Sequence, residues 1–120
     1  MTNGATATFT GLSFESASAG ENGGVFCLTG YSSLSVGDAE FQDNTGSRGA
    51  AIYANTASIV HITNTAMTSN SVQGNGGAIF GASESTLYMT DSSFTANSCS
   101  GAGGALWCVL DEFLVAYGGL

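Results

Sequence analysis

The chain has almost no basic residues. Arg48 is the only arginine, lysine is absent, and nine Asp and Glu give a formal net charge of −8 over 120 residues. A nucleic-acid-binding protein must neutralise several phosphates, so we expect no nucleic-acid partner. The basic patch that attracts proteins to anionic lipid is missing as well. We expect the acidic balance to serve mainly solubility.

Long apolar runs are also missing. The longest, Phe113–Tyr117, is far too short to span a membrane. The first residues are polar, with neither the basic start nor the apolar centre of a signal peptide. Any secretion signal is therefore expected to lie outside this chain, which would then be a fragment of a longer protein or a unit that stacks end to end.

Cysteine is scarce and odd in number, at Cys27, Cys99 and Cys108. Their spacing matches no metal site, and calcium is possible but supported by no motif, so we expect no cofactor. A disulfide between Cys99 and Cys108 is one interpretation. Unpaired thiols that pack as small apolar groups are the other.

A two-part phrase recurs about every 27 residues. The first part is a small-residue step into an apolar pair, and its first positions are 26, 27 and 27 residues apart. The copies are Gly23-Gly24-Val25-Phe26, Gly49-Ala50-Ala51-Ile52, Gly76-Gly77-Ala78-Ile79 and Gly103-Gly104-Ala105-Leu106. The second part is an apolar residue followed three positions later by Asn. Its copies are Phe41/Asn44, Met67/Asn70 and Phe94/Asn97, after a degenerate copy at Phe14/Ala17. Two separate motifs that recur with the same spacing of about 27 residues indicate a repeat protein.

Strands fit this repeat better than helices. Short alternating runs such as Leu34–Val36, Val60–Ile62 and Leu87–Met89 are separated by Gly, Ser, Asn and Asp, and no helical periodicity is sustained. About 27 residues with three short strands make one coil of a parallel β-helix, in which each strand pairs with its equivalent one coil away. We predict an all-β, single-stranded, right-handed parallel β-helix of roughly four coils that forms one domain over residues 1–120; the handedness follows from the general preference of parallel crossovers.

Equivalent residues should stack in columns. Interior columns are expected at Phe26/Ile52/Ile79/Leu106, at Phe14/Phe41/Met67/Phe94 and at Phe9/Val36/Ile62/Met89, while Cys27/Tyr53/Phe80/Trp107 should point to the opposite side of its strand. Gly23, Gly49, Gly76 and Gly103 suit a tight bend. Asn44, Asn70 and Asn97 should form a ladder of amide hydrogen bonds.

The two motifs together resemble the repeats of chlamydial polymorphic outer membrane proteins and of related right-handed β-helix proteins. Gly76–Ile79 matches the Gly-Gly-Ala-Ile pattern fully, and the resemblance extends over about residues 7–120. The chain departs from the pattern at Ala17, Ala50 and Met67. The resemblance implies a cell-surface or secreted passenger domain with a structural or adhesive role, and it carries over no catalytic residue.

An enzyme is the alternative class, because some parallel β-helices cleave polysaccharides. The candidate column is Gly11/Asp38/Asn64/Asp91, in which the backbones of Asp38 and Asp91 should lie two coils, or about 9.6 Å, apart. That spacing is near the upper end for an inverting carboxylate pair. Asp and Asn are also ordinary turn residues, and Arg48 and His61 occupy other columns, so we expect turns and no catalysis.

Two further expectations concern surfaces. A face for ice or crystals needs regular Thr files, and the sequence offers only one, Thr10/Thr63/Thr90, interrupted by Gly37. Counting 27 from Leu87 makes Leu114 the start of a new strand, with no Lys or Pro to block its edge. We expect self-association or contact with neighbouring coils, and a host or matrix surface protein or glycan as a partner.

Overall fold

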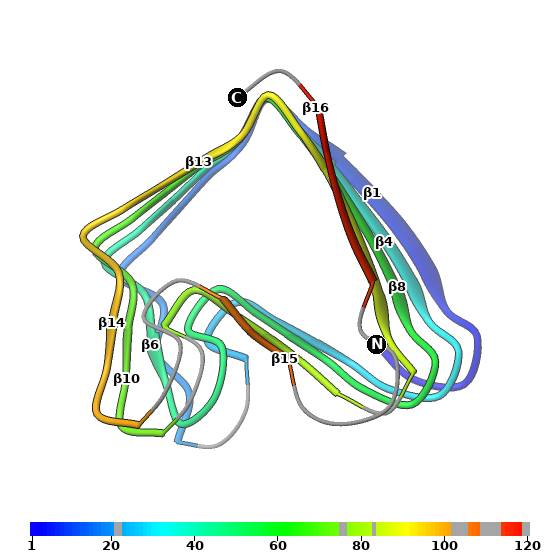
Figure 1. Ribbon diagram of the computed structural model, residues 1–120, viewed down its shortest axis with the longest axis horizontal. Coiled ribbons are helices and arrows are strands. Elements are labelled where there is room, and N and C mark those ends of the chain that lie inside the picture. The colour runs from blue at the N-terminus through cyan, green and yellow to red at the C-terminus, as the bar shows by residue number, and fades with distance from the viewer. Residues whose placement is uncertain (21–22, 75–76, 83, 102–105, 109–113, 119–120) are drawn as a thin grey trace.

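The computed structural model describes residues 1–20, 23–74, 77–82, 84–101, 106–108 and 114–118. These residues form a β-solenoid in which every paired strand is parallel to its neighbour one turn away. Figure 1 looks along the coil, and the successive turns lie almost on top of one another. The predicted all-β parallel solenoid is thereby confirmed, and its right-handedness stays a prediction.

Four parallel sheets form the sides of the coil. The five-stranded sheet contains β1 (Thr6–Thr10), β4 (Ser33–Gly37), β8 (Ile59–Thr63), β12 (Thr86–Thr90) and β16 (Leu114–Gly118). The phenylalanine sheet contains β2 (Ser13–Glu15), β5 (Glu40–Gln42), β9 (Ala66–Thr68) and β13 (Ser93–Thr95). The short sheet contains β6 (Thr45–Gly46), β10 (Ser71–Val72) and β14 (Ser98–Cys99). The isoleucine sheet contains β3 (Phe26–Leu28), β7 (Ile52–Ala54), β11 (Ile79–Gly81) and β15 (Leu106–Cys108).

Each complete turn has four strands, where the sequence predicted three. The turns β3–β6, β7–β10 and β11–β14 are complete, with β1 and β2 before them and β15 and β16 after them. The described strands thus make about three full turns with partial turns at both sides, against the roughly four coils predicted. The additional strands β6, β10 and β14 are only two residues long. Two residues are too few to show the alternation that identifies a strand in a sequence.

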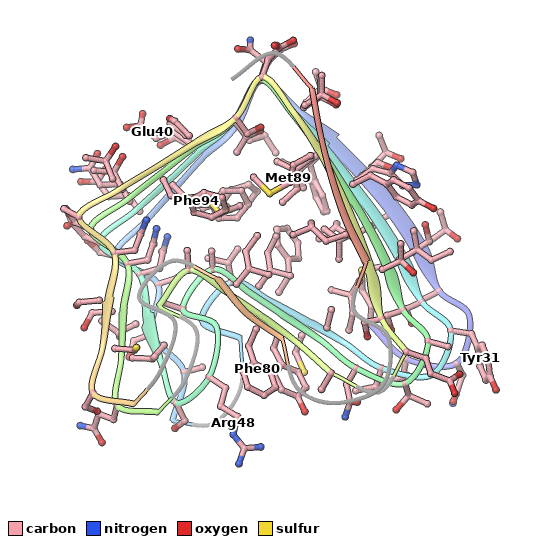
Figure 2. The ribbon with its side chains drawn as sticks, in the orientation of Figure 1. Tyr31, Glu40, Arg48, Phe80, Met89 and Phe94 are labelled. Atoms are coloured by element: carbon pink, nitrogen blue, oxygen red, sulfur yellow. The ribbon has the colours of Figure 1, made fainter. Side chains whose placement is uncertain are left out.

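The interior columns pair in the predicted register. Phe41 lies between Phe14 and Met67, and Met67 pairs with Phe94. The rings of Phe14 and Phe41 stack with centroids 4.8 Å apart. Figure 2 shows Met89 and Phe94 pointing into the coil from two different sheets. The stacked apolar side chains form one continuous core, and its fully buried members include Leu34, Ile52, Met67, Ile79 and Leu87.

One predicted equivalence is wrong by a residue. The structure pairs Leu87 with Val115, whereas counting 27 residues from Leu87 gave Leu114. The strand before this position, β15, keeps the step of 27, since Ile79 pairs with Leu106. Five residues connect β15 to β16, compared with four between β11 and β12. The extra residue in the connection moves the register, which a fixed repeat length cannot anticipate.

The bend before the isoleucine sheet depends on glycine at two described positions. Gly23 and Gly49 have φ of 66° and 61°. A Cβ atom at either position would lie about 2 Å from a backbone carbonyl oxygen, that of Phe26 or Ile52. Both the left-handed conformation and the close approach therefore require glycine. The equivalent Gly76, and the pair Gly103 and Gly104, lie outside the described residues.

Candidate functional site

Repeated bends with positive φ turn the chain at several corners of the coil, and two of these corners adjoin the phenylalanine sheet. At the corner between the five-stranded sheet and the phenylalanine sheet, Gly11, Asp38, Asn64 and Asp91 have φ between 46° and 69°. At the corner between the phenylalanine sheet and the short sheet, Ser16, Asp43, Ser69 and Ala96 have φ between 54° and 56°. Left-handed residues at the same place in successive turns keep the coils superimposed.

The Asn ladder follows the second corner, and its members Asn44 and Asn70 are buried. Asn70 donates from Nδ2 to the carbonyl oxygen of Phe41 and to Oδ1 of Asn97, each at 3.0 Å. Its Oδ1 accepts from the backbone N–H and from Nδ2 of Asn44, at 3.1 and 3.0 Å. Asn44 and Asn70 are 0 % exposed. The Asn70 amide thereby satisfies two buried backbone groups of the preceding turn, the carbonyl of Phe41 and the N–H of Asn44. The ladder is therefore part of the architecture and not a ligand site.

A buried serine ladder, which sequence reasoning missed, stabilises the corner before the five-stranded sheet. Ser32, Ser58 and Ser85 are each 0 % exposed. Each hydroxyl donates to the carbonyl oxygen three residues earlier, in Thr29, Asn55 and Ala82 respectively, at 2.6–2.7 Å. The spacing of 26 and 27 residues between these serines was the available signal. It was hidden because serine is abundant throughout the chain.

The candidate carboxylate pair lies at the first corner, which we call the acidic corner and define by Asp38, Asn64 and Asp91. All three side chains are exposed. The adjoining strand ends pair in register, so Asn64 occupies the layer between the two aspartates. Asn64 donates from Nδ2 to Oδ1 of Asp38 at 2.8 Å. The structure therefore places the two predicted residues in alternate layers, with an amide between their carboxylates.

A shallow groove follows this corner, lined also by Glu40, Thr65 and Ser93. Among the residues that the structure describes, no three His, Cys, Asp or Glu side chains are placed to hold one metal ion. Positive φ at every position of the column is the conformation that turn residues adopt. An inverting hydrolase would need a water held between the two carboxylates, where Asn64 lies in this column.

The outer side of the five-stranded sheet is a different surface. We call it the neutral face and define it by the outward residues of β1, β4, β8 and β12, which are Thr6, Thr8, Thr10, Ser33, Ser35, Gly37, Ile59, His61, Thr63, Thr86, Tyr88 and Thr90. None of them is Asp, Glu, Lys or Arg. Ile59 and Tyr88 are two of the four large hydrophobic residues that the structure exposes. This face can make hydroxyl and ring contacts without charge.

Two neighbouring aromatic side chains on this face form a stack. His61 of β8 pairs with Tyr88 of β12, and their rings are nearly parallel, with centroids 4.7 Å apart and an interplanar angle of 12°. The Thr file runs through Thr10, Gly37, Thr63 and Thr90 in the predicted register. No second Thr file accompanies it among the described strands, so ice binding gains no support from the register.

The column that begins at Cys27 lies on the other side of the isoleucine sheet from the core. Its members Tyr53 and Phe80 are nevertheless only 6 % and 4 % exposed, and their rings stack with centroids 5.3 Å apart. The guanidinium carbon of Arg48 lies 5.6 Å from the centre of the Phe80 ring, and Figure 2 shows both side chains below this sheet. Cys27 is exposed and carries a free thiol. The one arginine of the chain is therefore remote from the neutral face.

The described part of the chain has no helix long and apolar enough to cross a membrane. Comparison with curated proteins and with solved structures found no match. The family model of the Chlamydia polymorphic membrane protein (Chlamydia_PMP) repeat matches residues 64–82 and 91–109.

Each matched segment starts at the acidic corner and ends after the isoleucine strand, so it covers three consecutive strands and leaves the five-stranded sheet out. This match confirms the resemblance that the sequence motifs indicate. Such a repeat in a β-solenoid is compatible with a surface repeat protein. Over residues 64–82 and 91–109, the chain is similar to the repeat of the Chlamydia polymorphic membrane proteins.

Proposed function

We propose that the chain is a non-catalytic segment of a cell-surface solenoid that adheres to its partner through the neutral face. The observation that carries the proposal is the breadth of this uncharged surface. Each strand of the five-stranded sheet is five residues long and none contains a charged residue, whereas the strands of the isoleucine and short sheets, which are also uncharged, are only two or three residues long. An uncharged surface rich in hydroxyls, with exposed Ile59 and Tyr88, suits a partner that must approach closely.

The outer side of the phenylalanine sheet is less suited to contact. It carries Glu15 and Glu40, and Figure 2 shows Glu40 pointing away from the coil. Asp38 and Asp91 continue this charge along the acidic corner. Host surfaces and matrix glycans often carry negative charge, which repels such a side of the solenoid.

The family match supports the same division. The matched segments contain the bends, the Asn ladder and the interior columns of β9 and β13, which build the coil. Strands β8 and β12, which contribute half of the neutral face, lie outside them. Residues that a repeat does not need for folding are free to differ, and they are the ones through which one family can recognise different partners.

A pair of matched double variants tests adhesion. Beads coated with the chain are counted on cultured epithelial cells, before and after Thr63→Asp/Thr90→Asp on the neutral face. Thr68→Asp/Thr95→Asp on the phenylalanine sheet is the control, because both pairs occupy adjacent layers and add the same charge. We expect the first variant to lose at least about tenfold in attachment and the control to lose less than about twofold. Equal losses in both, or none in either, would remove the neutral face from the proposal.

The absence of catalysis is tested at the acidic corner. We expect no product when the chain is incubated with acidic and neutral polysaccharides, with and without calcium. Asp38 and Asp91 are exposed turn residues, and the amide of Asn64 lies in the layer between them. Reproducible cleavage that disappears in both Asp38→Asn and Asp91→Asn would establish the enzyme alternative instead.

End-to-end contact remains part of the proposal. Strands β1 and β16 form the two edges of the five-stranded sheet, and within the described chain each is hydrogen-bonded to a strand on one side only. Open parallel edges accept a further strand, and head-to-tail stacking gives open assemblies. We expect sedimentation velocity to show oligomers that grow with concentration. A single monomeric species at millimolar concentration would argue against stacking.

A further inference from the structure

We infer that the neutral face contains a binding trough over β4 that takes one pyranose ring of a neutral glycan, stacked on the free side of the His61 ring. This inference rests on the proposed adhesive function and names the ligand class. It comes from an outward column of the five-stranded sheet in which one side chain is smaller than its neighbours. From one turn to the next, that column reads Thr8, Ser35, His61 and Tyr88.

The trough exists because β4 has the smallest outward side chains of the sheet. Ser35 lies between Thr8 and His61, and the next column has Gly37 between Thr10 and Thr63. The resulting groove is open to solvent, has a volume of about 420 Å³ and is lined by these six residues together with Phe9 and Val36. This volume is within the range of small-ligand sites. The side chains of Phe9 and Val36 pack with the core, so outward groups of β1 and β8 form the walls.

One wall of the trough presents a ring surface. Tyr88 covers the side of His61 that faces β12, with the two rings 4.7 Å apart and nearly parallel. The opposite side of the imidazole therefore faces the layer of Ser35, where no large side chain lies. His61 is exposed, so this surface is open to a ligand. A ring placed there would continue the stack by one layer.

The height of the gap favours a sugar over a flat aromatic ring. Thr8 and His61 are two layers apart, which is about 9.6 Å between their backbones. Two van der Waals contacts of about 3.5–4.0 Å use about 7–8 Å of that height. The remainder of about 2 Å suits a puckered pyranose, which is thicker than a planar ring.

The chemistry of the walls agrees with this choice. A pyranose has an apolar C–H side for the imidazole and a rim of hydroxyls. Thr8, Thr10, Ser35 and Thr63 supply hydroxyls that both donate and accept hydrogen bonds. No lining residue is acidic or an arginine. The chain has a formal net charge of −8 with His61 counted as neutral at pH 7, and its one arginine lies beside Phe80, so an acidic sugar meets no fixed positive charge here.

The experiment is an NMR titration of the whole chain with neutral hexasaccharides of glucose, mannose and N-acetylglucosamine, and with a hexa-uronate. We expect at least one neutral hexasaccharide to shift the backbone amide signals of Ser35, Gly37 and His61 with a Kd on the order of 1 mM, as a single stacked ring would give. The hexa-uronate should leave these signals unchanged. If no neutral sugar shifts them at tens of millimolar, or if an aromatic amide such as N-acetyltyrosinamide saturates them and the sugars do not, the glycan assignment is wrong.

Two substitutions on one strand separate the trough from the rest of the face. Ser35→Tyr should fill the gap and weaken binding at least about tenfold, because its ring replaces the ligand in the stack. Ser33→Tyr is the matched control, on the same strand and face but outside the groove, and should change Kd less than about twofold. Gly37→Thr is a second blocking variant. A Cβ at Gly37 would meet only the Thr63 carbonyl oxygen, at 3.9 Å, so this change should fold.

Failure of the inference can be told from failure of the proposed function. If Ser35→Tyr keeps sugar affinity, the trough is not the site, whatever the cells show. If Ser35→Tyr keeps cell attachment while Thr63→Asp/Thr90→Asp abolishes it, the neutral face is adhesive without the trough. If sugar binding is measured and lost in Ser35→Tyr, but coated beads never attach to cells, the trough stands and the adhesive function fails.

Discussion

Two neighbouring columns of the five-stranded sheet, one inward and one outward, differ in how they repeat. Inward, Leu34, Val60 and Leu87 are 0–1 % exposed and are all aliphatic. Outward, the residues beside them run from Ser35 through His61 to Tyr88, with a different side chain in each layer. The two sides share the same strands and backbone hydrogen bonds. The difference between the two columns therefore comes from the roles of their side chains and not from the fold of the backbone.

This contrast teaches where the solenoid can change. An inward residue touches its equivalents above and below in a closed core, so a change of volume in one layer is felt in three. An outward residue touches solvent on its open side, and its replacement leaves the core intact. Under the proposed function, recognition can thus vary from turn to turn on the neutral face while the coil stays the same.

The largest expected effect is in the core. Phe41 is 0 % exposed and stacks on Phe14, so Phe41→Ala should lower the free energy of unfolding by about 3–5 kcal/mol. Phe94→Ala, in the same column but only partly buried, should lower it less. Urea unfolding followed by circular dichroism measures both. Equal losses at the two positions would mean that burial does not set the energy of the column.

The next effect separates two asparagines in different surroundings. Asn70→Asp removes the donor to the carbonyl oxygen of Phe41 and to Asn97 in a fully buried site, and should lower the free energy of unfolding by about 2–5 kcal/mol. Asn64→Asp makes the same exchange on the exposed acidic corner, and this substitution should lower the free energy of unfolding by less than about 1 kcal/mol. Thermal unfolding at neutral pH gives the comparison. If Asn70→Asp unfolds at the same temperature as the unchanged chain, the ladder is not needed for stability.

A smaller effect is expected at the serine ladder. Ser58→Ala removes a buried hydroxyl that donates to the carbonyl oxygen of Asn55, and should lower the free energy of unfolding by about 0.5–1.5 kcal/mol. Ser13→Ala, at an exposed position of β2, should change it by less than about 0.5 kcal/mol. Calorimetry distinguishes these values. If the two variants unfold at the same temperature, the serine ladder has no role in stability.

The smallest effect on stability belongs to the neutral face. Thr63→Val keeps the shape of an exposed β-branched residue and should change the free energy of unfolding by less than about 0.5 kcal/mol. The same substitution removes a hydroxyl from the proposed trough, so sugar affinity should fall about threefold or more while the fold is unaffected. A large loss of stability at Thr63 would contradict the division between the two sides.

The repeat step predicted the fold and most of its columns, because equivalent residues in a parallel solenoid lie one above another. It missed β6, β10 and β14, since two-residue strands show no alternation. It also gave Leu114 in place of Val115 as the partner of Leu87, because one extra residue precedes β16. The burial of Tyr53 and Phe80 could not be predicted, as it depends on what covers the outer side of the isoleucine sheet.

The candidate site was less predictable than the fold. Asp38 and Asp91 were found because carboxylates recur in one column, and the structure places them at positive φ in a bend. The trough depends on something the repeat does not contain, namely a small residue beside the free side of a stacked ring. Ser35 and His61 are ordinary as separate residues, and only their register, together with the His61–Tyr88 stack, makes the proposed site.

The most direct test of the central claim is one mutational scan with two readouts, in which every single substitution of the chain is scored for folded abundance and for attachment to cells. We predict that losses of abundance follow the inward columns and the Asn ladder. Losses of attachment at normal abundance should gather on the neutral face, around β4 and β8. If attachment-specific losses instead gather at the acidic corner, or are spread evenly over all outward positions, the account is wrong.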